Sequence, residues 1–202
     1  MKNYDRVYSR RGLYWRNDPN SLCREVVEIL SQEDPRRKKV IDLGSGEGRD
    51  LMHFSRNGFS ATGVEISLPG INKSLEWAKG EEVEIDLVQS DLNDFKLESE
   101  YGVIYSSGSL TFIRPENRGD AFADYKSHTS PGGLNAFNVF VVKPFMGTVP
   151  DWGDNEYFYR EGELASYYFD WKIIKSESET FSCNSGGLRH THAMETLMAR
   201  KM

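Results

Sequence analysis

Residues 40–50, VIDLGSGEGRD, place three alternating glycines directly after a short apolar run. The run at 40–43 has the composition of a buried strand, and residues 48–57 have the apolar spacing of a helix. Because glycine has no Cβ atom, the backbone between them can turn tightly and a ligand can lie against it. A strand that passes through such a turn into a helix begins a βαβ unit, which predicts an α/β fold with a mostly parallel sheet.

The alternation of strand and helix continues along the chain. We expect helices at residues 21–30, 48–57, 69–79, 115–128 and 161–168. We expect strands at residues 40–43, 60–65, 83–89, 102–106, 134–142, 171–176 and 194–199, with a turn at 130–133. The final two strands have no helix between them, so they are predicted to pair antiparallel at an edge of the sheet.

The 202 residues have the length of a single domain. Residues 1–35 are predicted to form an N-terminal cover followed by a helix. Residues 143–160, KPFMGTVPDWGDNEYFYR, are rich in Gly, Pro and aromatic residues and show no regular period. Because a connection of this length is unusual in a compact domain, we expect it to be a lid or a substrate loop, with Phe145, Trp152 and Tyr157 as its aromatic contacts.

Composition excludes several classes of partner. A formal net charge of −6 argues against a long nucleic acid, and no apolar run is long enough to span a membrane. The first residues carry no apolar signal region. Cys23 and Cys183 lie far apart without zinc-type spacing, so we expect packing roles, no metal site and a cytoplasmic location. The expected partner is a small molecule, bound by a monomer or weak homodimer.

Three acidic residues follow or end the first three predicted strands. Asp42 ends the first strand, Glu65 ends the second and Asp91 follows the third. The carboxyl ends of parallel strands meet at one edge of a sheet, so these side chains should lie together. Either of the later two acids could instead be a helix cap or a surface charge, and the glycine turn could serve packing alone. Jointly they indicate an adenosine-containing ligand, with Glu65 on the ribose hydroxyls and Asp91 on the adenine amino group.

The ligand could be a dinucleotide or a cationic nucleoside. A dinucleotide would place its pyrophosphate at the start of the helix that follows the turn. The spacing here is GxGxG, and Glu47 and Asp50 flank that point. These two acids would repel a pyrophosphate, although the positive charge of Arg49 would offset part of the repulsion. S-adenosylmethionine, which carries a sulfonium and no phosphate, fits better. A nicotinamide-dependent oxidoreductase remains an alternative, because Glu65 lies roughly 20 residues after the first glycine, as such a site requires. A cofactor-binding module without turnover is a third possibility.

These motifs resemble those of class I S-adenosylmethionine-dependent methyltransferases. The resemblance covers nearly the whole chain and implies a single Rossmann-like methyltransferase domain, with a seven-stranded, mostly parallel sheet and a C-terminal antiparallel hairpin. It also implies that Tyr105, Ser106 and Ser107 lie beside the methionine half of the cofactor. Tyr14 and Trp15 are similar to an N-terminal aromatic cover seen in this group. The cofactor-binding residues that we expect are Tyr14, Trp15, Asp42, Gly44, Ser45, Gly46, Gly48, Arg49, Glu65, Ile66, Asp91, Leu92, Ser106 and Ser107.

A finer resemblance lies near the C-terminus. Residues 160–171, REGELASYYFDW, and 195–201, ETLMARK, are similar to the closing segments of the tellurite-resistance (TehB-like) methyltransferases. In that group a histidine and an arginine of the final hairpin are implicated in catalysis, which makes Arg189, His190 and His192 the catalytic candidates. Solvated hairpin histidines are the alternative. The order of these residues differs from the group's, so the acceptor stays open among a thiol, a metalloid oxyanion such as tellurite or selenite, and another metabolite.

Overall fold

The computed structural model describes residues 4–33, 38–147, 153, 155–184 and 187–202. Its strands are β1 Lys39–Leu43, β2 Ser60–Glu65, β3 Asp86–Gln89, β4 Tyr101–Ser107, β5 Thr129–Val142, β6 Tyr159–Arg160, β7 Lys172–Cys183 and β8 His190–Arg200. Its helices are α1 Tyr4–Tyr8, α2 Ser21–Ser31, α3 Arg49–Arg56, α4 Leu68–Gly80, the short 3₁₀ helix η2 Ser109–Phe112, α5 Pro115–Ser127 and α6 Glu163–Ser166.

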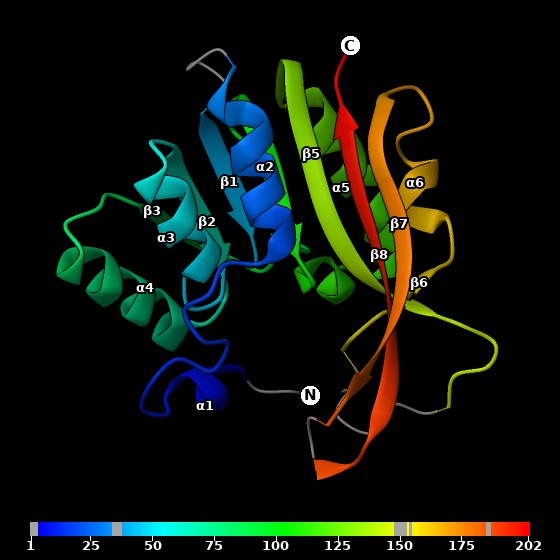
Figure 1. Ribbon diagram of the computed structural model, residues 1–202, viewed down its shortest axis with the longest axis horizontal. Coiled ribbons are helices and arrows are strands. Elements are labelled where there is room, and N and C mark those ends of the chain that lie inside the picture. Colours follow the sequence, from blue (N-terminus) through cyan, green and yellow to red (C-terminus); the bar gives the residue numbers. More distant parts are fainter. Residues whose placement is uncertain (1–3, 34–37, 148–152, 154, 185–186) are drawn as a thin grey trace.

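The strands form one mixed sheet in the order β3-β2-β1-β4-β5-β8-β7, with the short β6 beside β5 (Figure 1). Strands β1 to β6 pair in parallel, whereas β8 pairs antiparallel with both β5 and β7. The expected α/β class and the antiparallel C-terminal hairpin are therefore confirmed. The strand order reverses between β1 and β4, and such a reversal opens a crevice at the carboxyl ends of the strands.

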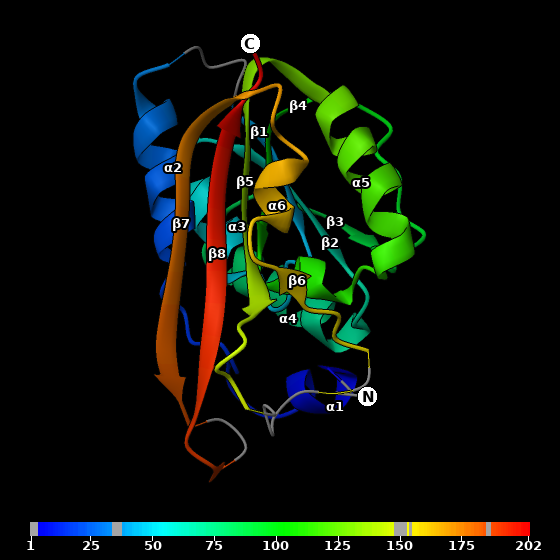
Figure 2. The same cartoon turned by 90° about the vertical axis from the view of Figure 1, so that its right-hand side faces the viewer.

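Helices cover both faces of the sheet (Figure 2). On one face α2 and α3 bury Leu22, Leu30 and Phe54 against the strands. On the other face α5 and α6 bury Phe122 and Leu164. Each helix therefore contributes one apolar side to a core, as its spacing predicts. Within the described ranges, no helix combines the length and the apolar character that crossing a membrane requires.

Local chemistry explains where several helices begin. The Asn20 side chain accepts a hydrogen bond from the backbone N–H of Leu22 and caps α2, as predicted. Pro69 lies in the first turn of α4, where a missing N–H costs nothing. Gly48 starts α3 with a φ of +85°, a left-handed conformation that favours glycine.

The prediction of a turn at residues 130–133 is wrong, because this segment belongs to β5. The register between β4 and β5 shifts there, so the glycines form an irregularity in a continuing strand. Gly132 and Gly133 also exchange backbone hydrogen bonds with Lys201. Because Lys201 is distant in sequence, the Ser-Pro-Gly-Gly composition of this segment gave no sign of the pairing and indicated a turn instead.

Four other elements differ in extent from the prediction. β3 starts at Asp86 rather than at residue 83, because the Val83 N–H bonds to the Ala78 carbonyl at the end of α4. α6 spans only Glu163–Ser166. The hairpin strands β7 and β8 are longer than expected, since they continue past the sheet as a two-stranded ribbon (Figure 1).

Candidate functional site

A cavity of about 750 Å³ lies at the carboxyl ends of β1, β2, β4 and β5. Its walls come from the glycine turn, the N-terminal segment, the connection before β6 and the outer part of the C-terminal hairpin, where β7 ends and β8 begins. Cavities of this size are typical of small-molecule sites and occur at this place in open α/β sheets. The position predicted from the three strand-end acids is therefore hollow.

Backbone conformation and packing within the chain both explain the glycines of the turn. Gly44, Gly46 and Gly48 all have positive φ angles. A Cβ atom on Gly44 would lie 2.2 Å from the Cβ of Ser109, and one on Gly48 would lie 2.6 Å from the Ser74 hydroxyl. The prediction that the missing Cβ atoms make room for a ligand is therefore incomplete, because neighbouring side chains already occupy that space at two of the three glycines.

Asp42 is buried on the cavity wall, and only 3% of the residue is exposed. Within the described part of the chain, no hydrogen-bond donor is recorded for its carboxylate. Burial raises the pKa of Asp42, the negative charge of Asp50 adds to the increase, and Arg49 opposes it. A buried carboxylate without a donor is costly, so this position favours a cationic ligand group.

Glu65 lies at the end of β2 and also lines the cavity. One of its oxygens accepts the Gly46 N–H at 2.9 Å, and the other accepts the Ser67 N–H at 2.7 Å. Burial raises the pKa of Glu65, and these backbone hydrogen bonds counteract the increase. A carboxylate offers about four lone-pair sites, so each oxygen retains acceptor capacity. Glu65 therefore supports the glycine turn as well as facing the cavity.

Asp91 follows β3 and stabilises its own turn. Its Oδ1 accepts hydrogen bonds from the backbone N–H of Asn93 at 2.8 Å and from the Asn93 side chain at 2.9 Å. Both bonds involve the same oxygen, and no donor to Oδ2 is found among the described residues. Leu92 and Ile66 lie on the same part of the cavity wall and supply apolar surface beside the acid.

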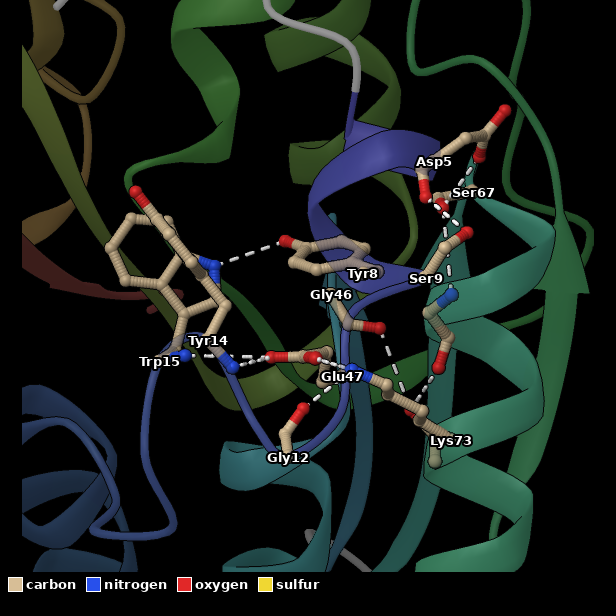
Figure 3. A network of polar contacts seen from close by, with 12 residues as sticks. Asp5, Tyr8, Ser9, Gly12, Tyr14, Trp15, Gly46, Glu47, Ser67 and Lys73 are labelled. Carbon is tan, nitrogen blue, oxygen red and sulfur yellow. Dashed lines mark hydrogen bonds and ion pairs between the residues drawn. The ribbon is translucent and has the colours of Figure 1, made fainter. Parts of the chain in front are cut away.

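The N-terminal segment is attached to the glycine turn by Glu47 (Figure 3). The Glu47 carboxylate accepts the backbone N–H of Tyr14 at 2.7 Å and pairs with Lys73 of α4 at 2.7 Å. Lys73 also donates to the Gly12 carbonyl at 2.6 Å. The negative charge of Glu47 is therefore satisfied within the protein. This corrects the argument that Glu47 would repel a pyrophosphate.

Tyr14 and Trp15 line the cavity, as predicted for an aromatic cover. Their rings meet edge to face with centroids 4.8 Å apart, and the Trp15 indole donates to the Tyr8 hydroxyl at 3.0 Å. Tyr8 lies against Gly46 beneath this cover. Asp5 accepts a hydrogen bond from Ser67 at 2.6 Å and holds α1 beside α4. Sequence reasoning missed Tyr8 and Asp5, since a short polar segment has no period that indicates its contacts.

Two residues expected near the methionine half of the cofactor lie behind the wall. The Tyr105 hydroxyl donates to Asp50 at 2.8 Å, and the Ser106 hydroxyl donates to the Leu43 carbonyl at 2.7 Å. Both residues are fully buried, and neither is on the cavity wall. Ser107, the next residue, does line the cavity. Asp50, which accepts from Tyr105, also accepts the backbone N–H of Asn20 and so joins β4 to the residue that caps α2.

The C-terminal hairpin brings one of its three catalytic candidates to the cavity. His192 lines the wall, together with Phe140 and Met194. His190 lies behind it, with its Nε2 atom 2.9 Å from Nε2 of His192. Arg189 is exposed and is not on the wall.

The predicted lid is described in part. Residues 155–158 line the cavity, and the Tyr157 N–H donates to the Thr111 carbonyl at 2.7 Å. Phe145 is exposed and lies away from the wall. Trp152 lies outside the described residues.

Of the predicted site residues, the cavity wall includes Tyr14, Trp15, Asp42, Gly44, Ser45, Gly46, Arg49, Glu65, Ile66, Asp91, Leu92, Ser107 and His192. Gly48, Ser106, Arg189 and His190 are not on it. The wall also includes Asn138, Phe140 and Cys183, which were not predicted as site residues. Parallel strands bring their carboxyl ends together at one edge of the sheet, and this rule placed the three acids. It could also have found Asn138 and Phe140, because both lie near the carboxyl end of β5.

Comparison with known proteins identifies relatives of the whole domain. The family model for the tellurite resistance protein TehB matches residues 14–195. Hemagglutinin 1 of Eikenella corrodens is 27% identical over 78% of this chain and 50% of its own length. The probable S-adenosyl-L-methionine-dependent methyltransferase TehB of Haemophilus influenzae (strain Rd) is 27% identical over 81% of this chain and 57% of its own. The chain thus spans about half the length of these curated relatives.

The solved structures agree on the fold. The crystal structure of TehB from Haemophilus influenzae superposes with a TM-score of 0.77 at 23% identity, covering 98% of this chain and 66% of that one. The common architecture is that of the class I methyltransferases, with the antiparallel hairpin at the C-terminal edge of the sheet. Because the family model extends over nearly the entire chain, this protein belongs to the tellurite resistance protein TehB family.

Proposed function

We propose that this chain transfers a methyl group from S-adenosylmethionine to a small, soft acceptor. The observation that carries the proposal is the set of acids around one cavity, with Asp42 buried and without a recorded donor in the described part of the chain. Buried charges in proteins are paired. A ligand with a positive charge and an adenosine would meet this requirement, and the TehB relative is named as S-adenosyl-L-methionine-dependent.

The residues present fit such a cofactor. When bound, it would supply a methyl group on a sulfonium, which is an electrophile with a good leaving group. Asp42 would balance positive charge, Glu65 would accept ribose hydroxyls through its remaining lone pairs, and Asp91 would accept from the adenine amino group through Oδ2. Ser45 Oγ and Asn138 Oδ1 are buried atoms without a hydrogen-bond partner in the described ranges, and both residues line the cavity. A polar group of the ligand would satisfy Asn138 Oδ1, whereas Ser45 Oγ lies beside Gly63 of β2.

The cover would supply alignment and exclude water. Methyl transfer requires the reacting atoms to lie in line at about 3–3.5 Å. Tyr14 and Trp15 are held by their backbones to the glycine turn, so their rings form a fixed roof over one end of the cavity. Aromatic faces near a cationic ligand add cation–π attraction. The described part of the predicted lid lines the other side of the cavity.

The strand order indicates where the acceptor would lie. The three acids belong to the β3-β2-β1 half of the sheet, so the acceptor would occupy the opposite half. There the wall carries Phe140, Phe181, Met194 and His192. Sulfur and aromatic groups are polarizable and favour soft ligands. A thiol, or a metalloid oxyanion such as tellurite or selenite, suits this surface, and His192 is the residue placed to accept a proton.

Calorimetric titration with S-adenosylhomocysteine and with NAD⁺ tests the cofactor. We expect S-adenosylhomocysteine to bind and NAD⁺ not to bind. Incubation with methyl-labelled cofactor and a panel of thiols, tellurite, selenite and small carboxylates then identifies the acceptor. Binding of NAD⁺ alone would indicate an oxidoreductase. Tight cofactor binding without turnover on any acceptor would indicate a binding module.

Variants of the hairpin test which groups take part in the transfer. His192→Ala should lower methyl transfer and leave the affinity for S-adenosylhomocysteine unchanged, because His192 lies in the acceptor half of the cavity. His53→Ala, in α3 away from the cavity wall, is the matched control. Equal turnover in His192→Ala and the parent protein would remove this histidine from the reaction.

A further inference from the structure

We propose that Cys183, His190 and His192 form a binding site for a borderline transition-metal cation of the Zn²⁺ type. One donor atom from each residue lies within 4.8 Å of the other two. A thiolate and two imidazoles are a donor set that selects zinc and similar metals over Mg²⁺ and Ca²⁺. No metal site was expected from sequence, because the two cysteines show no zinc-type spacing.

The regular geometry of the ribbon brings the three residues together. Cys183 of β7 lies directly opposite His190 of β8 in the antiparallel register. Side chains of directly opposed residues share a face of the sheet, and so do residues two apart on one strand. His192 therefore lies on the same face as His190 and Cys183. The strands themselves set the spacing of the three donors.

The two imidazoles are already close to a ligating arrangement. Their Nε2 atoms are 2.9 Å apart. Tetrahedral zinc with Zn–N bonds of about 2.0–2.1 Å requires a separation of ~3.3 Å between two nitrogen ligands. Separating the two imidazoles by a few tenths of an ångström would therefore admit a metal between them. The hydrogen that lies between the two Nε2 atoms would move to Nδ1 of His192, so that both imidazoles bind as neutral ligands. The proton released on metal binding would come from the Cys183 thiol.

A backbone carbonyl sets the orientation of His190. Its Nδ1 lies 2.7 Å from the carbonyl oxygen of Leu188. A carbonyl can only accept, so Nδ1 carries the hydrogen and a neutral His190 presents the lone pair of Nε2 to the site. Metal-bound histidines usually have such a partner on the second nitrogen, which fixes the tautomer and the direction of the ring.

The site lies at the edge of the cavity, from which a fourth ligand would enter. Cys183 and His192 both line the cavity wall, and the rings of Phe140 and Phe181 lie 5.3 and 5.6 Å from that of His192. Three protein ligands with an open fourth position are typical of catalytic rather than structural zinc. A thiolate or oxyanion acceptor would occupy that position, and this last step alone rests on the proposed function.

Cobalt(II) titration of the metal-free full chain tests the site, because thiolate–Co²⁺ charge transfer is visible by absorption. We expect saturation at one ion per chain, with Zn²⁺ displacing Co²⁺. Cys183→Ser should abolish the charge-transfer band, and His190→Ala or His192→Ala should weaken binding by at least about tenfold. Cys23→Ala and His53→Gln, which change the other cysteine and a distant histidine, should leave binding unchanged.

Three outcomes would overturn the site: no uptake by the parent protein, a band that survives Cys183→Ser, or equal losses in the control variants. Circular dichroism of each variant separates loss of the site from loss of the fold. S-adenosylhomocysteine titration of the same samples separates the two proposals. Cofactor affinity without metal uptake contradicts only the metal site, and metal uptake without cofactor affinity contradicts only the methyltransferase.

Discussion

The carboxylate of Glu47 lies 2.7 Å from the ammonium group of Lys73 and also accepts the backbone N–H of Tyr14. One side chain of the glycine turn therefore joins α4 to the cover of the cavity. The Glu47 side chain is 2% exposed and that of Lys73 is 21% exposed. Removing the lysine would leave a buried carboxylate with hydrogen bonds but without its cation.

Lys73→Met should lower the free energy of unfolding by about 1–3 kcal/mol, because one partner of a largely buried charged pair is lost. It should also weaken S-adenosylhomocysteine binding, because the cover loses its link to α4. Denaturant unfolding and calorimetric titration measure the two effects. Lys79→Met changes an exposed lysine of the same helix and is the control. Equal stability and affinity in the two variants would contradict the role of the pair.

Asp42→Asn should reduce the affinity for S-adenosylmethionine by at least about tenfold, since the loss of one charged hydrogen bond costs about 1.5–3 kcal/mol. The asparagine keeps the shape of the side chain and removes its negative charge. Asp86→Asn, at the exposed start of β3, is the matched control. If Asp42→Asn binds the cofactor as the parent does, then Asp42 is not the group that balances its charge.

The pH dependence of cofactor binding follows from the same carboxyl group. Burial, reinforced by Asp50, raises the pKa of Asp42, so the folded protein holds this proton more tightly than the unfolded chain does. The stabilising contribution of the group is therefore complete at low pH and is lost as pH rises through the folded pKa. A cationic ligand favours the ionised form, so its affinity should increase over that same interval. Titrations at a series of pH values should show this increase in the parent and not in Asp42→Asn.

Gly44→Ala should destabilise the protein more than Gly58→Ala does. Both glycines have φ angles near +80°, but a Cβ on Gly58 meets nothing within 4 Å, whereas one on Gly44 meets Ser109 at 2.2 Å. Backbone strain alone costs about 1–2 kcal/mol, and the clash should add about 1–3 kcal/mol at Gly44. Thermal or denaturant unfolding compares the two. Adding Ser109→Gly to Gly44→Ala should recover part of the difference, and no recovery would contradict the steric explanation.

Arg118→Lys should loosen the segment that precedes α6. The buried guanidinium donates to Glu163 at 2.7 Å and to the Tyr157 carbonyl, and it lies 3.7 Å from the centre of the Tyr159 ring. A lysine cannot reproduce this planar fork. We expect faster amide hydrogen exchange at Tyr157 and a weaker apparent affinity for the acceptor. Arg160→Lys, at an exposed position, is the control, and equal exchange in the two variants would contradict the assignment.

Sequence patterns predicted the parts of this molecule that depend on strand order. The alternation of strands and helices indicated a parallel sheet, and the carboxyl ends of its strands had to meet at one edge. Asp42, Glu65 and Asp91 could therefore be placed together without coordinates. The cover could not be derived in this way, because the Lys73–Gly12 hydrogen bond joins residues 61 positions apart in segments without periodicity.

The lengths of the two strands in the C-terminal hairpin were underestimated for a related reason. Its strands were expected to stop at residue 176 and to restart at residue 194, where the apolar alternation ends. β7 in fact continues to Cys183 and β8 begins at His190, along a ribbon whose residues are partly exposed. Pairing of Cys183 with His190 depends on that extra length. No local pattern distinguishes such a ribbon from a loop.

The ribbon has a consequence for how this fold diversifies. β5 ends its pairing with β8 at Val141 and Ala193, whereas β7 and β8 remain paired as far as Cys183 and His190. Among the described residues, this projecting tip shares no hydrogen-bond ladder with β1 to β3, at whose carboxyl ends the three acids lie. Selection can remodel the tip in sequence and length without disturbing the nucleoside half of the cleft. A chimera that exchanges residues 177–192 with those of a relative should then have the acceptor specificity of the relative and the methyl-donor affinity of this chain.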